Sequence, residues 1–128
     1  MIEALVDTSV FIATESGWLI DTLKIPAMLG VSVITIGELH AGVLGATDLG
    51  TRDDRLSTLT FARSVEPMPI DEAVAATWAR LRIELLEAGR RLGTNDSWIA
   101  ATAIAAGIPV ITQDADYDDV PGLIVIRV

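Results

Sequence analysis

Acidic residues stand beside several of the apolar segments of this chain, where carboxylates could bind a metal ion. Five acids occupy such positions, namely Asp7, Glu38, Asp96, Asp114 and Asp116. Taken singly, each could cap a helix or shape a turn. Several carboxylates that converged at one mostly apolar place would instead repel one another and raise their pKa values unless a cation were bound. As a set, the five acids therefore predict a metal site.

The residue types in the chain define which metal to expect. The chain has no cysteine and one histidine, which excludes thiolate zinc sites and makes a typical zinc site unexpected. Oxygen ligands suit hard ions, so Mg²⁺ or Mn²⁺ is the expected cofactor. Such an ion can activate a water and stabilise the departing oxygen of a phosphodiester without a protein nucleophile. The acids thus favour metal-dependent hydrolysis at phosphorus.

Short apolar runs alternate with helical patterns along the whole chain. Strands are expected at residues 2–6, 31–34, 65–68, 108–112 and 123–127. Helices are expected at residues 8–23, as two pieces broken at Gly17, and at 35–46, 51–63, 71–87 and 95–107. The runs are uniformly apolar, which indicates strands buried on both faces of a mostly parallel sheet.

The predicted architecture is a single α/β domain over residues 1–128, with a doubly wound central sheet of four to five strands flanked by helices. Pro67 and Pro69 favour an edge position for the strand at 65–68. Thr35 is expected to cap the helix that carries Glu38. In such a sheet, ligands bind where the strands end and the following helices begin, and all five acids map to that edge.

Composition limits the possible functions further. The chain has 128 residues, of which 51% are hydrophobic, so it can bury a sizeable core and is not disordered. Its formal net charge of −9 excludes a generally basic surface for nucleic acid. No apolar run reaches the roughly 20 residues of a membrane span, and the N-terminus lacks the basic region of a secretory signal. We expect a cytoplasmic protein.

Four segments resemble one known family. They are LVDTSVFI at 5–12, ITIGELHAGV at 34–43, NDSWIAATAIAAG at 95–107 and VITQDADYDDVPGLIVI at 110–126. These segments are similar to the PIN-domain family, and specifically to the VapC ribonuclease toxins of toxin–antitoxin pairs. The resemblance spans nearly the whole chain, and the acidic blocks follow the family order.

The resemblance implies a Mg²⁺- or Mn²⁺-dependent endoribonuclease, the toxin of a type II VapBC system, that hydrolyses RNA with metal-activated water. Its partners would be RNA and a VapB-type antitoxin, with the toxin as a homodimer inside the complex. Matching the blocks gives the catalytic and metal-binding acids Asp7, Glu38, Asp96 and Asp114. Asp116 is a neighbour of Asp114 or its substitute as a metal ligand.

Four neighbouring residues are expected to support these acids. Thr8, Ser9 and Thr112 would orient ligands or water, because the family often has hydroxyl residues there. Asn95 either caps its helix or supports Asp96. His40 is predicted to pack on the apolar side of its helix, and the three tryptophans to lie in the core or in dimer contacts.

The basic residues admit two interpretations. Six arginines make up most of the positive charge, namely Arg52, Arg55, Arg80, Arg82, Arg90 and Arg91. They either lie on solvated helix faces, paired with Glu84 and Glu87, or some of them grip RNA phosphates beside the acids.

Two other functions compete with RNA hydrolysis. A non-catalytic α/β binding domain would use the acids as a structural cation site, which stabilises the fold without turnover. Phosphoryl transfer through Asp7 fits poorly, because position 9 is serine where haloacid dehalogenases have a second aspartate. A receiver domain fits no better, since the only lysine is Lys24.

Overall fold

Five short strands form one sheet in the computed structural model, which describes residues 1–128. They are β1 (Ala4–Val6), β2 (Leu29–Ser32), β3 (Glu66–Met68), β4 (Val110–Thr112) and β5 (Val125–Arg127). Their order is β3-β2-β1-β4-β5, and every neighbouring pair is parallel. The predicted parallel sheet is confirmed, and so is the edge position of the strand that contains Pro67.

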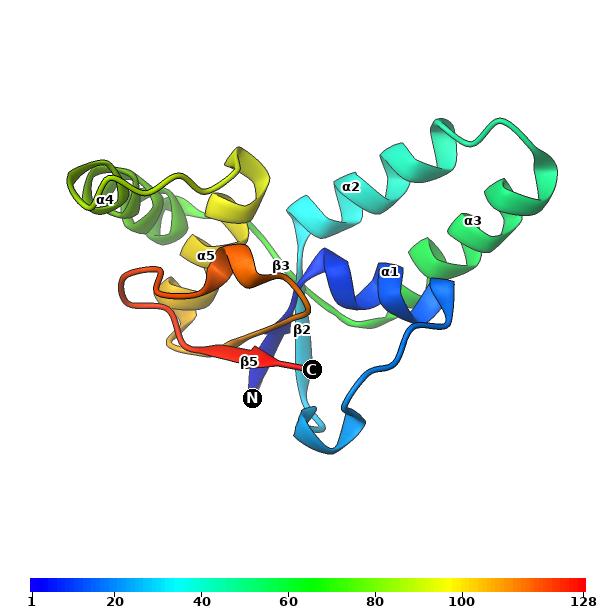
Figure 1. Ribbon diagram of the computed structural model, residues 1–128, viewed down its shortest axis with the longest axis horizontal. Coiled ribbons are helices and arrows are strands. Elements are labelled where there is room, and N and C mark those ends of the chain that lie inside the picture. The colour runs from blue at the N-terminus through cyan, green and yellow to red at the C-terminus, as the bar shows by residue number, and fades with distance from the viewer.

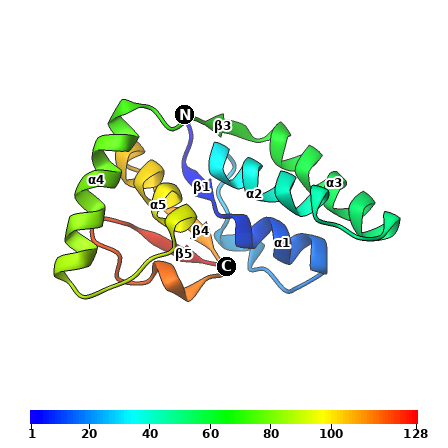
Figure 2. The same ribbon diagram turned by 90° about the horizontal axis from the view of Figure 1, so that it is seen from above.

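Helices cover both faces of this sheet (Figure 1). They are α1 (Thr8–Ser16), α2 (Val33–Leu44), α3 (Leu49–Ser64), α4 (Glu72–Glu87) and α5 (Thr94–Ala106), with 3₁₀ turns η1 (Thr22–Lys24) and η2 (Ala115–Tyr117). Figure 2 shows α1, α2 and α3 on one side and α4 with α5 on the other. None of the helices combines the length and the apolar composition needed to cross a bilayer.

Side chains of alternating residues in β1 pack into two separate hydrophobic clusters, one on each face of the sheet. Ala4 and Val6 of β1 pack with α1, α2 and α3, whereas Leu5 packs with α4 and α5. Because both faces are covered, every residue of β1 and β4 is buried, which explains their continuous apolar sequence.

Local capping fixes where the helices begin and end. Side chains of Asp7, Ser32, Asp48 and Asp71 accept main-chain N–H bonds at the starts of α1 to α4. Gly17 and Gly107 end α1 and α5 in the left-handed conformation, with φ of 71° and 69°. The predicted breaks at these two glycines are thus where the helices end.

The boundary between β2 and α2 differs from the prediction. The strand ends at Ser32, whose hydroxyl accepts from the Ile34 N–H at 3.0 Å. Val33 and Ile34 are therefore helical, and Thr35 is a buried residue inside the first turn rather than the cap. The error has a simple cause, because β-branched apolar residues suit both a buried strand and a buried first helical turn.

The strand order places a topological switch between β1 and β4. The chain runs outward from β1 to β2 and β3, and then crosses to build β4 and β5 on the opposite side. The register pairs Val6 with Ile111, so Asp7 and Thr112 lie next to each other at the carboxyl ends of the two strands. Such a crevice is the usual ligand site of an open parallel sheet.

The packing of α4 against the sheet predicts that truncating a buried leucine of α4 costs more stability than truncating an exposed one. Leu81 is 2% exposed in the cluster around β1 and β4, whereas Leu86 is 75% exposed on the same helix. We expect Leu81→Ala to lower the free energy of unfolding by about 2–5 kcal/mol, because it leaves a cavity, and Leu86→Ala by less than about 0.5 kcal/mol. Urea unfolding checks both values, and equal losses would contradict the packing described.

Candidate metal centre

Asp7 lies at the switch point and is 2% exposed. One carboxylate oxygen, Oδ2, accepts from the Ser9 N–H at 3.3 Å and the Thr112 hydroxyl at 2.9 Å. The other, Oδ1, accepts from the Tyr117 hydroxyl at 2.8 Å. Burial of a charge is costly unless it is hydrogen-bonded, and here α1, β4 and η2 each supply a donor. Asp7 therefore joins three elements that are far apart in the sequence.

A directed chain of hydroxyl groups supports Asp7. Thr112 gives its only hydroxyl hydrogen to Asp7, so Ser9 must be the donor across the 3.1 Å contact between the two hydroxyl oxygens. The main-chain N–H groups of Gln113 and Asp114 complete the chain by donating to Ser9 and Thr112 at 3.0 and 2.9 Å. Ser9 and Thr112 thus orient Asp7 and also hold the start of the loop after β4.

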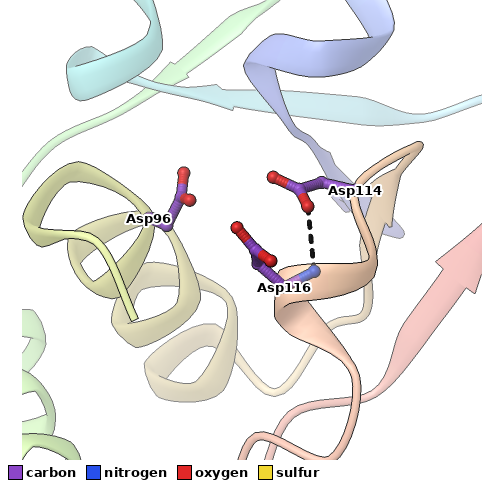
Figure 3. A group of neighbouring side chains, drawn as sticks. All are labelled: Asp96, Asp114 and Asp116. Carbon is purple, nitrogen blue, oxygen red and sulfur yellow. Dashed lines mark hydrogen bonds between the residues drawn. The ribbon is translucent and has the colours of Figure 1, made fainter. Parts of the chain in front are cut away.

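Three further carboxylates converge beside Asp7. Asp96 comes from the first turn of α5, and Asp114 caps η2 by accepting from the Asp116 N–H at 2.8 Å. One carboxylate oxygen from each of Asp96, Asp114 and Asp116 lies within 4.8 Å of the others. Figure 3 shows the three side chains directed toward a common space between α5 and η2. Asp114 and Asp116, which the sequence left as alternatives, both belong to this cluster.

Glu38 reaches the same edge from α2 but stands outside the cluster of three. The Thr8 hydroxyl donates to Glu38 Oε1 at 2.7 Å. Because that donation uses the only hydroxyl hydrogen of Thr8, Thr35 must donate across the 2.8 Å contact between the two threonines. Glu38 also lines two hollows, of about 510 and 380 Å³, and is half-buried.

Tyr117 is the central residue that the sequence interpretation missed. It is fully buried, and its hydroxyl lies 2.8 Å from Asp7 Oδ1 and 3.1 Å from Asp96 Oδ1. Burial, reinforced by these two negative charges, raises the pKa of Tyr117 far above its usual value. The phenol therefore stays protonated and shares one hydrogen between two carboxylates. The signal in the sequence was the single tyrosine of the chain, directly after Asp116.

Burial and the charges of the neighbouring acids both act on the pKa of Asp96. Burial raises its pKa from 3.8 to about 6, and the charges of Asp7, Asp114 and Glu38 add to the increase. The hydrogen bond from Tyr117 acts in the opposite direction and lowers the pKa of Asp96. A cation would relieve this repulsion, and a purely oxygen-donor set fits a hard divalent ion.

The remaining sequence predictions at the site have mixed outcomes. Asn95 is exposed and does not cap α5, because Gly93 takes the cap position. Asn95 instead lines the larger hollow beside Glu38. His40 is exposed rather than packed, because it turns away from the buried side of α2 marked by Leu39.

The structure also excludes one of the two alternatives for Trp18 and for the arginines. Trp18 is 61% exposed, which excludes the core and leaves the dimer contact as the prediction. The expected pairing of arginines with Glu84 and Glu87 is absent, since the ion pairs are Lys24 with Asp21 and Arg127 with Asp118. The i,i+4 spacing of Arg80 with Glu84 therefore produces no ion pair within α4.

Comparisons with known proteins agree with this geometry. The sequence pattern of the PIN domain matches residues 4–123. Ribonuclease VapC5 of Mycobacterium tuberculosis is 49% identical over 116 residues, covering 91% of this chain and 86% of that protein. Ribonuclease VapC4 of the same organism is 47% identical over 125 residues, covering 98% and 96%.

Solved structures show the same fold. The crystal structure of VapBC-5 from Mycobacterium tuberculosis, a member of the VapBC family of toxin–antitoxin systems, matches with a TM-score of 0.90 at 43% identity over 100% of both chains. VapBC2 from Rickettsia felis, bound to a promoter DNA fragment, matches in fold with a TM-score of 0.83 at 23% identity. The parallel sheet of this chain, with acids at its carboxyl edge, is therefore a PIN fold. This chain belongs to the PIN-domain family, and it is similar to the VapC ribonucleases within that family.

The raised pKa of Asp96 predicts how stability depends on pH in the metal-free protein. The folded state binds the proton on Asp96 more tightly than the unfolded chain does. The stabilisation that comes from this proton is therefore fully present below pH 3.8 and is lost as the pH rises through about 6. At pH 8, Asp96→Asn should raise the free energy of unfolding by about 1–2 kcal/mol, allowing for solvent screening at this half-buried group. Urea unfolding in EDTA at pH 5 and pH 8 measures the effect, and no gain at pH 8 would contradict it.

The bridging hydroxyl predicts a specific defect in Tyr117→Phe. The ring remains in the core, but Asp7 and Asp96 lose a donor, so we expect about 1.5–3 kcal/mol of lost stability. Mn²⁺ affinity at pH 7 should fall about 10- to 100-fold, because the two carboxylates are no longer held in place. Calorimetric titration with Mn²⁺ tests this, alongside urea unfolding in EDTA. Unchanged Mn²⁺ affinity would show that Tyr117 serves the core alone.

Proposed function

We propose that this chain is a metal-dependent endoribonuclease and the toxin of a VapBC toxin–antitoxin pair. The observation that carries the proposal is the convergence of five carboxylates at the topological switch of a PIN fold, where burial, together with the charges of the neighbouring acids, raises the pKa of Asp96 to about 6. The similarity to proteins named ribonuclease VapC, over nearly the whole chain, supports RNA as the substrate.

The donor set fits Mg²⁺ or Mn²⁺. Asp96, Asp114 and Asp116 already bring three carboxylate oxygens within 4.8 Å of one another, and they would hold the ion together with Asp7 and Glu38. When bound, the ion supplies Lewis acidity and a water of lowered pKa. Positive charge at this point also lets Asp96 remain ionised at neutral pH, whereas without it the carboxylate is partly protonated.

The protein residues position the reacting groups. Ser9, Thr112 and Tyr117 hold both oxygens of Asp7, so this carboxylate keeps one orientation. Thr8 holds one oxygen of Glu38 and leaves the other free toward the hollows beside it. Glu38 is therefore placed to accept a hydrogen bond from water near the scissile phosphate. The acids of α5 and η2 face it across the edge of the sheet.

An exposed apolar surface fits the antitoxin partner. Trp18, Leu19 and Leu23, in the segment after α1, are 61%, 94% and 96% exposed. Beside them, an apolar hollow of about 210 Å³ lies between α1 and α3, where Phe11 and Phe61 meet edge to face. A VapB-type antitoxin would cover this surface, as the match to the VapBC-5 complex suggests. We expect the toxin to form homodimers within that complex.

RNA cleavage by Asp7→Asn tests the proposal. Purified, antitoxin-free wild type should cut total RNA with Mn²⁺, leave 5′-phosphate ends and lose activity in EDTA. Asp7→Asn should lower the cleavage rate more than about 100-fold, because it disturbs both metal binding and the hydroxyl network.

A matched control is Asp21→Asn, which removes an exposed carboxylate from the η1 region and should leave the rate unchanged. If the folded wild type cut no RNA but gained thermal stability from Mn²⁺, the chain would be a binding domain with a structural cation site instead.

A further inference from the structure

A hollow of about 320 Å³ lies between α4 and the start of α5, and its lining includes Ser97, the residue after Asp96. Three arginines line it, namely Arg82, Arg90 and Arg91, out of nine basic residues in a chain of net charge −9. Figure 2 shows how the chain leaves the end of α4 and returns to the start of α5 beside the sheet edge. We call this hollow the arginine pocket.

Two of the three arginines have no polar partner in the protein. The arginine side chains that donate hydrogen bonds are Arg52, Arg55, Arg90 and Arg127. Neither ion pair of the structure includes Arg82 or Arg91. In a chain with twice as many acidic as basic residues, two unpaired guanidinium groups around one hollow form a local positive site that an anion would complete.

Two tryptophans hold Arg82 in place. The rings of Trp78 and Trp98 stack with centroids 4.2 Å apart and planes 2° from parallel, and Trp78 Nε1 donates to the Ser97 hydroxyl at 3.0 Å. The Arg82 guanidinium carbon lies 5.0 Å from the Trp78 ring centroid on this fixed platform. Because Trp98 and Arg82 flank the Trp78 ring, the platform orients an arginine rather than receiving a base. A preoriented guanidinium loses little entropy when it binds phosphate.

The arginine pocket is physically joined to the acid cluster. Ser97, which anchors Trp78, directly follows Asp96 in the first turn of α5. Arg90 donates to the main-chain oxygens of Asp116 and Asp118, so it ties the pocket to the loop that carries two of the acids. A nucleic-acid strand that passed over the start of α5 would therefore meet both the cluster and the pocket.

We propose that the arginine pocket binds a backbone phosphate of the RNA substrate, next to the nucleotide that is cut. Guanidinium groups match phosphate oxygens with paired hydrogen bonds, and Thr94 adds a hydroxyl to the lining. The contact is independent of base sequence. The arginine pocket would thus attract the RNA backbone, which the carboxylates of the acid cluster would repel. The inference rests on the proposed ribonuclease function.

The experiment measures RNA binding without cleavage. A fluorescein-labelled single-stranded RNA of mixed sequence is titrated with protein in EDTA at several salt concentrations. For the double variant Arg82→Gln/Arg91→Gln we expect about 10-fold weaker binding and a salt slope reduced by about 1.4, which corresponds to two lost phosphate contacts on a single strand. With Mn²⁺ present, KM should rise while the cleavage rate at saturating RNA stays unchanged.

Two further variants exclude general charge and folding effects. Arg63→Gln/Arg80→Gln removes the same charge from exposed positions outside the pocket and should change affinity little. Arg82→Lys/Arg91→Lys keeps the charge and should recover part of the salt slope, and thermal unfolding verifies that each variant is folded.

The possible failures are distinguishable. Equal weakening in the Arg63/Arg80 control, or unchanged RNA binding by the folded pocket variant while wild type still cleaves RNA, would overturn the pocket assignment alone. A folded wild type that neither bound nor cleaved any RNA would overturn the proposed function itself.

Discussion

The burial of one charged carboxylate, Asp7, at the crossing point of the sheet is the constraint on which the rest of the site depends. A buried anion is tolerated only where donors surround it. Ser9, Thr112 and Tyr117 provide them, and the last two are more than 100 residues away in the chain. Satisfying Asp7 therefore brings α1, β4 and η2 to fixed positions, which carries Asp114 and Asp116 to the same edge as Asp96.

Function and stability oppose each other in this arrangement. The acids that would bind a cation repel one another in its absence, and burial together with this repulsion raises the pKa of Asp96. Tyr117 limits the cost because its one hydrogen serves two carboxylates. The site is thus assembled before the metal arrives, and binding energy is not spent on gathering the ligands.

The two helical layers give the edge two different surroundings. On the side of α1 and α3, the surface around Trp18 and Phe61 is apolar and suited to a protein partner. On the side of α4 and α5, the arginine pocket concentrates positive charge in an otherwise acidic chain. The acids lie between a surface that a partner would cover and a pocket that would hold the substrate.

The sequence alone determined the parallel sheet, the edge strand at Pro67 and the gathering of five acids at one edge. These follow from burial and chain order, because continuous apolar strands must be covered on both faces and helices after parallel strands start at one edge. Only the tertiary structure decided that Tyr117 bridges Asp7 and Asp96 and that Trp98 of α5 stacks on Trp78 of α4. Hydrogen bonds and stacking depend on which side chains meet in space, and residue type and local spacing do not specify that.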